Sequence, residues 1–313
     1  MNVLITGANG FLGSAIVRHA LDSEIPFCAT DIHESPRIPG VTYVPSDILS
    51  GPRPLLKGLT CVIHTAGLAH IFDSIQAQNA PFHSVNVTGT VNMLEAAAQA
   101  GVGHFILISS VSVYGPFTEG IYDEDVACSP VGPYATSKYE AEQRAREIAE
   151  RTGMALTILR LATLYGEDDP GNVGRLVRSL DRGRFIWIGT GANRKSLLYK
   201  EDAARACLIV ASRPASGVRV YNVSAPPCTM HEIVDGIAAA LDKRPFPVAV
   251  PAALALFISG MLSSNLHQTI KKWLSEDIYD TSRFEETFGF RTMTSLTDGL
   301  KVEVDCYRRK GAD

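Results

Sequence analysis

Residues 5–13 read ITGANGFLG, and this stretch decides which fold the chain adopts. It places Gly7, Gly10 and Gly13 between the apolar segment NVLITG and the helix-like segment GFLGSAIVRHALDS. A tight turn between a strand and a helix needs glycine, and a backbone without side chains can approach a pyrophosphate closely. The start of the helix supplies free N–H groups and the positive end of its dipole. The pattern predicts a dinucleotide-binding turn, with a plain tight turn as the alternative.

Short apolar strands alternate with helix-like segments on the C-terminal side of this turn. The strands are FCATD (27–31), TCVIHTAG (60–67), HFILISS (104–110) and ALTILR (155–160). The helices between them include VNMLEAAAQAG (91–101) and YATSKYEAEQRAREIAERTG (134–153). Near-continuous apolar strands that alternate with amphipathic helices indicate a parallel sheet covered on both faces. The sequence therefore predicts an α/β fold with a doubly wound parallel sheet.

The alternation weakens after residue 165, which indicates a second, smaller unit. We expect residues 1–165 and about 197–224 to form the dinucleotide-binding domain, with VRVYNVS (218–224) rejoining the main sheet. Residues from about 166 to 196 and from 225 to 313 are expected to form a mostly helical substrate-binding lobe. The apolar run VAVPAALALFISGMLSS (248–264) is shorter than the ~20 residues of a membrane span. It predicts a helix that is buried in the lobe or covers a ligand.

Composition narrows the class of protein. The chain has 313 residues, 46% hydrophobic and 20% charged, with a formal net charge of -4 and no block of basic residues. These values are typical of a soluble globular enzyme and do not favour nucleic acid or an anionic membrane as the main partner. The six cysteines form no CxxC pair, which predicts free thiols in a reducing cytosol and no metal site. The N-terminus shows no signal peptide pattern, so we expect a cytoplasmic location without stable membrane association.

Two aspartates follow predicted strands at positions that suit a cofactor. Asp31 stands about 20 residues beyond the glycines, where a carboxylate accepts hydrogen bonds from an adenosine ribose. A carboxylate there repels a 2′-phosphate, so NAD is favoured over NADP, although Arg37 is close enough to keep NADP open. Asp47 follows the third strand and is expected either to meet the adenine edge or to cap a turn.

Tyr134 and Lys138 stand one turn apart on a predicted helix, so their side chains share a face. An ammonium group near a phenol lowers the pKa of the phenol. The pair is therefore a candidate proton-transfer device near neutral pH, while two unrelated surface residues are the alternative.

Taken together, these segments resemble the extended short-chain dehydrogenases/reductases, in the NAD-dependent epimerase/dehydratase branch. The marks that carry the resemblance run in order along nearly the whole chain: TGANGFLG, Asp31, Asp47-Ile48, VIHTAG, VNVTGTVNMLEAA, ILISSVSVYG, YATSK, LRLATLYG, RKSLLYKED and YDTSRFEETFGF. The resemblance implies that Tyr134 is the catalytic base with Lys138 as its activating lysine, and that Ser110 is the third catalytic residue. The neighbouring Ser109 and Ser112 are alternatives for the catalytic hydroxyl, and Ser112 is the stronger of the two.

The resemblance also implies binding residues. For the cofactor they are Gly7, Gly10, Phe11, Leu12, Gly13, Asp31, Asp47, Ile48, Ala66, Gly67, Asn86, Tyr134 and Lys138. For the substrate they are Ser110, Ser112, Tyr134, Thr163, Asn172, Arg175, Arg194 and Lys195. Thr163 stands where sugar epimerases often have asparagine, and Lys195 replaces a common arginine. The cations are equally open to a role as solvated surface residues.

The reaction implied by the resemblance is 4-epimerisation of a UDP-hexose through transient oxidation at C4 by tightly bound NAD⁺. A 4-ketoreductase of a nucleotide sugar, using NAD(P)H, is the main rival because AGLAHIF and NRKSLLYKED are similar to segments of such enzymes. Dehydratases often carry an acidic pair where this chain has Val111 and Ser112. A steroid- or flavonoid-type alcohol dehydrogenase and a cofactor-sensing regulator are further alternatives. The family also implies a homodimer formed through the helices VNMLEAAAQA and YATSKYEAEQRAREIA.

Overall fold

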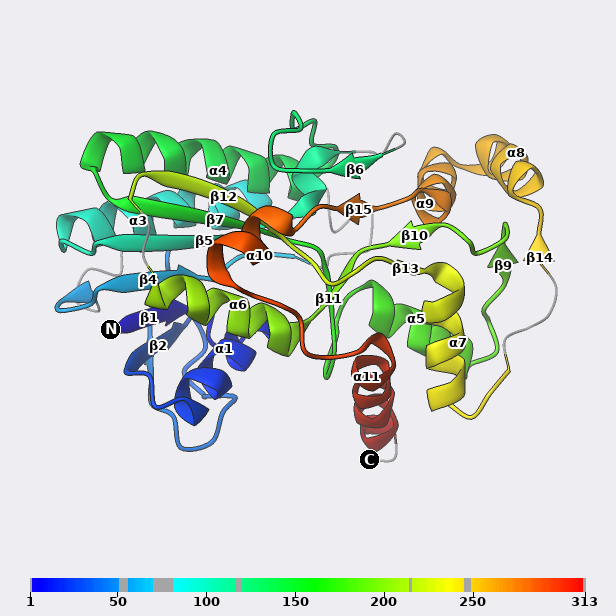
Figure 1. Ribbon diagram of the computed structural model, residues 1–313, viewed down its shortest axis with the longest axis horizontal. Coiled ribbons are helices and arrows are strands. Elements are labelled where there is room, and N and C mark those ends of the chain that lie inside the picture. The colour runs from blue at the N-terminus through cyan, green and yellow to red at the C-terminus, as the bar shows by residue number, and fades with distance from the viewer. Residues whose placement is uncertain are drawn as a thin grey trace.

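Seven parallel strands form the central sheet of the protein (Figure 1), seen here in a computed structural model that describes residues 2–50, 56–69, 81–115, 120–213, 216–244 and 249–311. The strand order is β12-β7-β5-β4-β1-β2-β3. The strands are β1 (Val3–Thr6), β2 (Phe27–Asp31), β3 (Tyr43–Pro45), β4 (Cys61–His64), β5 (His104–Ser110), β7 (Ala155–Leu161) and β12 (Val218–Val223). From β1 the chain adds β2 and β3 toward one edge of the sheet, and from β4 it adds β5, β7 and β12 toward the other edge. The direction of winding therefore reverses between β1 and β4. A crevice at the carboxyl ends of these two strands is the usual ligand site of such a sheet.

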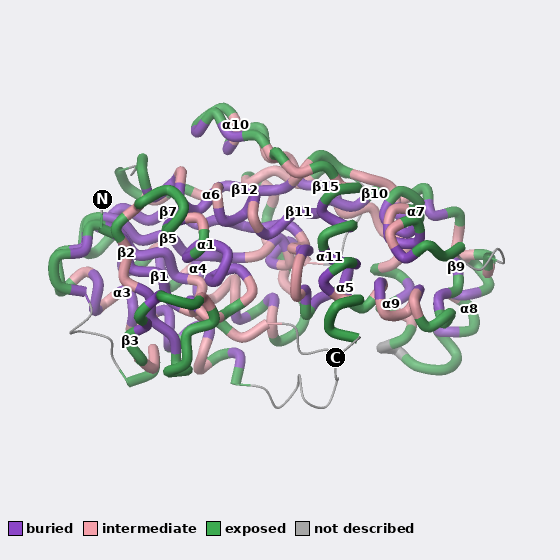
Figure 2. Tube along the Cα trace, turned by 90° about the horizontal axis from the view of Figure 1, so that it is seen from below, coloured by how far each residue is buried: buried purple, intermediate pink, exposed green. Residues whose placement is uncertain are grey.

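Two apolar layers cover the sheet because its strands are apolar at successive positions. Val3 and Ile5 of β1 join one core with helices α1 (Phe11–Asp22) and α6 (Lys200–Ser212). Leu4 points the other way and joins a second core with helices α3 (Gly89–Gln99) and α4 (Pro133–Thr152). Figure 2 shows the strands as the most continuously buried part of the tube. The predicted doubly wound α/β fold is confirmed, and so is the return of residues 218–223 to the sheet, where β12 pairs with β7.

The rest of the chain builds the lobe and its connections. Its helices are α5 (Asn172–Asp181), α7 (Met230–Ala240), α8 (Ala252–Leu262), α9 (Ser264–Leu274), α10 (Ser282–Phe288) and α11 (Leu296–Gly311). Short strands pair as β8 (Thr163–Tyr165) with β11 (Leu197–Tyr199), β10 (Arg194–Lys195) with β13 (Cys228–Thr229), β9 (Trp187–Ile188) with β14 (Ala249–Val250), and β6 (Ile121–Tyr122) with β15 (Ile278–Tyr279). The π-helix η2 (His83–Thr88) precedes α3, and the 3₁₀-helix η3 (Val111–Tyr114) follows β5.

Helix α10 lies against the sheet and not within the lobe. Phe284, Phe288 and Phe290 pack with Tyr221 of β12 in the core that also contains α1 and α6. The predicted boundaries placed the whole of residues 225–313 in the lobe, whereas this part of the chain returns to the dinucleotide-binding side. The remaining boundaries stay a prediction.

Helix α8 differs from its prediction. The apolar run was expected to be buried in the lobe or to cover a ligand, but only Ala255 and Ser259 of this helix are buried. Val248, at the start of the run, lies outside the described residues. The prediction of burial is wrong for α8 because apolar composition alone does not provide a packing partner. No helix within the described ranges combines the length and the apolar character needed to cross a bilayer.

Candidate active site

The glycine turn between β1 and α1 is packed so closely that side chains do not fit. Gly7 has φ +64°, and a Cβ there would lie 2.7 Å from the Cα of Ala66. A Cβ on Gly13 would lie 2.0 Å from the carbonyl oxygen of Gly7. The first turn of α1 is thereby held directly behind the turn, with its N-terminus at the carboxyl end of β1. This cradle fits a pyrophosphate, as the glycine spacing predicts.

Asp31 ends β2 beside this cradle. Its carboxylate accepts the backbone N–H of Asn9 at 2.9 Å and that of His33 at 3.1 Å. These bonds orient the carboxylate beside the turn, where a ribose hydroxyl can reach it. Asp47 accepts the N–H of Leu49 at 2.9 Å, the contact expected of a turn-capping aspartate.

The remaining cofactor candidates frame the same crevice. The Phe11 ring lies 5.2 Å from the Lys200 ammonium, while Leu12 is buried in α1. Ile48 packs against α3, where a Cβ on Gly89 would lie 2.5 Å from the Ile48 Cδ1. A contact between Ile48 and the cofactor stays a prediction.

The loop after β4 is fixed by Asn86. Its side chain accepts the N–H of Leu68 at 2.7 Å, and its amide donates to the Leu68 carbonyl at 3.0 Å and to Ser137 Oγ at 3.0 Å. A Cβ on Gly67 would lie 3.1 Å from Asn86 Oδ1 and 3.9 Å from Lys138 Nζ. Asn86 therefore holds the loop of Ala66 and Gly67 over the crevice and against the helix that carries Lys138.

Ser110, Tyr134 and Lys138 come together at the carboxyl end of β5. A hydrogen bond from Ser110 reaches the phenol of Tyr134 and acts to lower its pKa. Lys138 Nζ donates to the carbonyl oxygen of Ile108 at 2.5 Å. Ser109 faces the other side of the strand, where its hydroxyl donates to Glu142 at 2.5 Å. The geometry therefore separates the two serines and puts Ser110 on the side of the crevice.

Ser112 is placed by a helix and not by strand alternation. Strand β5 ends at Ser110, which caps η3 by accepting the N–H of Ser112 at 3.2 Å. The Ser112 Oγ is buried and has no hydrogen-bond partner among the described residues. Ser112 lies in η3, beyond the end of β5, so strand alternation does not set the direction of its side chain.

The electrostatics of the pair differ from the expectation of a phenol activated by its neighbour. Burial raises the pKa of Tyr134, and the hydrogen bond from Ser110 offsets part of this rise. Burial also lowers the pKa of Lys138 to about 8, while the charge of Glu142 raises it. The ammonium donates to the Ile108 carbonyl, and the lowering of the Tyr134 pKa by Lys138 that the spacing predicts is not found.

A buried ion pair that the sequence analysis missed lies behind Lys138. Glu142 and Arg160 are almost fully buried, and the Arg160 Nη2 donates to Glu142 Oε2 at 2.7 Å while its Nε donates to Oε1 at 3.1 Å. Arg160 Nη1 also donates to the Tyr114 hydroxyl at 3.1 Å. Two signals were available: Glu142 follows Lys138 by one helical turn, and Arg160 is the one charged residue in an apolar strand. A charge in such a strand requires a buried partner.

His64 is a second residue that the sequence analysis passed over. It is buried at the end of β4, with Nδ1 2.9 Å from Thr6 Oγ1 and Nε2 3.1 Å from Thr90 Oγ1. Burial and, to a smaller extent, the charge of Lys138 together lower the pKa of His64 to about 3. The neutral ring therefore links β1, β4 and α3 and does not act as an acid at neutral pH.

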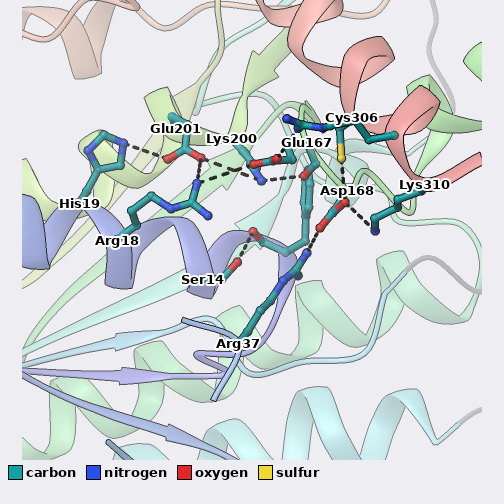
Figure 3. A network of polar contacts seen from close by, with 12 residues as sticks. Ser14, Arg18, His19, Arg37, Glu167, Asp168, Lys200, Glu201, Cys306 and Lys310 are labelled. Atoms are coloured by element: carbon teal, nitrogen blue, oxygen red, sulfur yellow. Dashed lines mark hydrogen bonds and ion pairs between the residues drawn. The ribbon is translucent and has the colours of Figure 1, made fainter. Parts of the chain in front are cut away.

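A polar network joins the loop between β2 and β3, which carries Arg37, to the lobe (Figure 3). The Arg37 guanidinium pairs with Asp168, whose carboxylate also pairs with Lys310 at 2.7 Å and accepts the Cys306 thiol at 3.0 Å. Burial raises the pKa of Asp168, but its hydrogen bonds from Lys310, Cys306 and Arg37 together hold it well below its usual range. Arg37, which kept NADP open in the sequence, is thus occupied by a carboxylate from the lobe.

The predicted substrate residues are not all collected in one place. Asn172 and Arg175 are exposed on the first turn of α5, and Thr163 is half-buried in β8. Arg194 is exposed and pairs with Glu276, with Nε 3.0 Å from Oε1. Lys195 is buried and donates to Asp277 Oδ2 at 2.8 Å and to the Lys272 carbonyl at 2.8 Å. The two cations are thus engaged within the lobe, and the diphosphate contacts stay a prediction.

A cleft of about 550 Å³ opens in the lobe beside these cations. It is lined by Gly189, Thr190, Asn193, Ala249, Val250, Pro251, Ala252 and Leu274. None of these residues belongs to the predicted substrate set. The cleft adjoins β10, which carries Arg194 and Lys195, through Asn193. Among the described residues, no cluster of three or more metal-ligating side chains is present.

The chain is similar in sequence and in fold to proteins of known family. Residues 3–224 match the model of the NAD dependent epimerase/dehydratase family. N-acetyl-alpha-D-glucosaminyl-diphospho-ditrans,octacis-undecaprenol 4-epimerase of Escherichia coli O157:H7 is 28% identical over 314 residues, covering 96% of this chain and 93% of that protein. UDP-glucose 4-epimerase of Vibrio cholerae is 29% identical over 321 residues, covering 98% of this chain and 95% of that protein. The solved structure of MoeE5 in complex with UDP-glucose and NAD is 27% identical, has a TM-score of 0.81 and covers 99% of both chains.

Proposed function

The chain belongs to the NAD dependent epimerase/dehydratase family, and from that premise we propose that it is a nucleotide-sugar 4-epimerase of the UDP-hexose type. NAD is the cofactor, in agreement with the glycine cradle and Asp31 at the end of β2. The observation that carries the proposal is the meeting of Ser110, Tyr134 and Lys138 beside the Gly67 loop. The Vibrio cholerae relative, which is matched along nearly its whole length, supports the same reaction.

Each of the three residues has a task that its position allows. Tyr134 takes the proton of the C4 hydroxyl as that carbon is oxidised, and it returns the proton when the carbon is reduced again. Ser110 donates a hydrogen bond that orients the reacting oxygen. Lys138 is held by the Ile108 carbonyl in the same site, and we assign it the stabilisation of the phenolate during the reaction, although its charge does not lower the resting pKa of Tyr134. NAD⁺, which the glycine cradle and Asp31 would hold, would supply the hydride acceptor for the oxidation of C4 and the hydride donor for the return step.

The proposal is tested by incubating the purified protein with a panel of UDP-hexoses and UDP-N-acetylhexosamines, without added cofactor, and separating the products. A C4 epimer from at least one sugar is expected, because the oxidised cofactor is regenerated in each cycle. Turnover of a 4-keto sugar that depends on added NAD(P)H would instead identify the 4-ketoreductase. NAD⁺ released from the heat-denatured protein is the expected companion result.

A second substrate class is favoured by one observation. The exposed apolar face of α8 suits a sugar carried on a polyprenyl diphosphate, the kind of substrate named for the Escherichia coli relative. The same catalytic residues would then act on the same sugar carbon, and only the carrier of the diphosphate would differ. Assaying one sugar on both carriers decides between them.

The assembly belongs to the proposal as well. We expect a homodimer formed through α3 and α4, which pack together on one face of the sheet. Light scattering of the purified protein is the measurement, and a monomer at assay concentration would contradict it. The cytoplasmic location stays a prediction.

A further inference from the structure

Helix α8 presents an unusually apolar surface at the end of the molecule that lies farthest from the N-terminus (Figures 1 and 2). Leu254, Phe257, Ile258, Met261 and Leu262 recur at the spacing of one helix face, and all are exposed. Phe257 is 67% exposed, Met261 75% and Leu262 70%. Leu266 of α9 extends the same apolar character. We call these six side chains the α8 patch.

The opposite face of α8 packs against α9. Ala255 and Ser259 are buried there, and Ser259 Oγ lies 3.2 Å from His267 Nδ1. The helix is therefore held in the fold by a hairpin, and its apolar residues face outward from a fixed support. Contiguous exposed apolar surfaces of this kind mark sites of contact with proteins or membranes.

The hairpin has a charge that suits an anionic surface. Residues 249–274 contain no Asp or Glu, but they contain Lys271 and Lys272, although the chain as a whole carries -4. Ala252 and Leu274 line one cleft, which places the lysine end of α9 beside the start of α8. Both lysines are exposed, and neither forms an ion pair within the described part of the chain. An apolar helix face beside cations is typical of helices that lie in the interface of an anionic bilayer.

We propose that the α8 patch docks the protein on the surface of an anionic lipid bilayer. The helix would lie in the interface, with Phe257 and Met261 among the acyl chains and Lys271 and Lys272 at the phosphate groups. A second copy of the chain fits less well, since six side chains are far fewer than the roughly 20–30 residues a side of a stable protein interface. The run 248–264 predicts no stable membrane association because it is shorter than a membrane span, but that length does not exclude a helix that lies in the interface.

The inference goes beyond the proposed function and does not depend on it. Docking would bring the cleft of the lobe, which includes Pro251 and Ala252 at the start of α8, close to the lipid headgroups. A soluble UDP-sugar remains accessible from the solvent in that position. A sugar diphosphate on a lipid carrier would have its diphosphate at the same level as Lys271 and Lys272.

The experiment is cosedimentation of the full chain with vesicles of phosphatidylcholine and phosphatidylglycerol in equal parts, and with vesicles of phosphatidylcholine alone. We expect binding to the anionic vesicles, with at least a roughly tenfold loss in the variant Phe257→Ser/Met261→Ser, because two apolar side chains no longer enter the acyl region. The variant Lys271→Gln/Lys272→Gln is expected to lose roughly tenfold in preference for anionic over neutral vesicles. Met293→Ser is the matched control, because Met293 is 78% exposed but lies outside the hairpin.

Three results would overturn the proposal. The wild-type chain does not bind the vesicles, the Phe257/Met261 variant binds as well as the wild type, or light scattering shows that this variant changes a dimer to a monomer without any vesicle binding. The far-UV circular dichroism spectrum of each variant and its binding of NAD are the controls for folding. Turnover of UDP-sugars without vesicles tests the proposed function separately, so a failure of either idea is recognised by itself.

Discussion

Replacing Glu142 by Met removes one half of a fully buried ion pair and leaves Arg160 without a counter-charge. The side chains are 0% and 4% exposed, and the structure gives three contacts between them within 3.3 Å. Ser109 adds a fourth hydrogen bond to Glu142. Breaking a buried pair from one side costs about 3–5 kcal/mol, mainly because a desolvated charge remains.

The expected results form a double-mutant cycle. Glu142→Met and Arg160→Met each lower the free energy of unfolding by about 3–5 kcal/mol, while the double variant loses much less than their sum because no charge stays buried. Glu147→Met is the matched control on the same helix, since Glu147 pairs with Arg144 at the surface. An exposed pair of that kind contributes about 0–1 kcal/mol.

Urea denaturation followed by circular dichroism measures the wild type, the two single variants, the double variant and the Glu147→Met control. The reasoning is refuted if Glu142→Met costs less than about 1 kcal/mol, the range of a surface pair, or if the two single losses simply add. The same variant also has a functional consequence. Because the charge of Glu142 raises the pKa of Lys138, its removal lowers that pKa further, and turnover should fall off at a lower pH than in the wild type.

Three further predictions concern Tyr134, the ion pair between Arg37 and Asp168, and Glu303 of helix α11. Tyr134→Phe should lower kcat by ~10²–10⁴-fold while NAD still binds, and unchanged kcat would remove the proton-transfer role. Asp168→Asn releases Arg37 toward a 2′-phosphate, so titration should show NADP binding roughly tenfold tighter, and no change would mean that the ion pair does not restrain Arg37. Burial raises the pKa of Glu303 to about 9, so the folded chain keeps a proton that the unfolded chain releases above about 4.5, and stability falls as pH rises between these values. Glu303→Gln should flatten this slope in urea titrations at pH 5 and pH 8; an unchanged slope would assign it to other groups.

The sheet and its cofactor turn could be predicted because both depend on local sequence. Most strands of the sheet are largely apolar at successive positions, and the glycines of residues 7–13 stand between the first strand and the first helix, where a tight turn needs them. The pairing of β12 with β7 could be predicted because crossover connections between parallel strands are right-handed. Ser110, the last residue of β5, was assigned by the resemblance, because the apolar strand before it does not by itself separate Ser110 from Ser109 and Ser112.

The parts that were missed depend on residues far apart in the chain. Lys195 meets Asp277, and Arg37 meets Asp168, over separations that no local pattern records. The pKa of Tyr134 is raised by burial and lowered by the hydrogen bond from Ser110, and the spacing of Tyr134 and Lys138 predicts neither effect. The exposure of α8 was missed for a related reason, since an apolar run predicts burial only if another element is present to cover it.

The most direct test of the account uses a UDP-hexose that carries deuterium at C4. Transient oxidation with Tyr134 as the base predicts that the purified protein forms the C4 epimer without added cofactor and that the deuterium stays at C4, because the same hydride is removed and returned within one site. Loss of the label to water, or product formation only when NAD(P)H is added, would contradict the account.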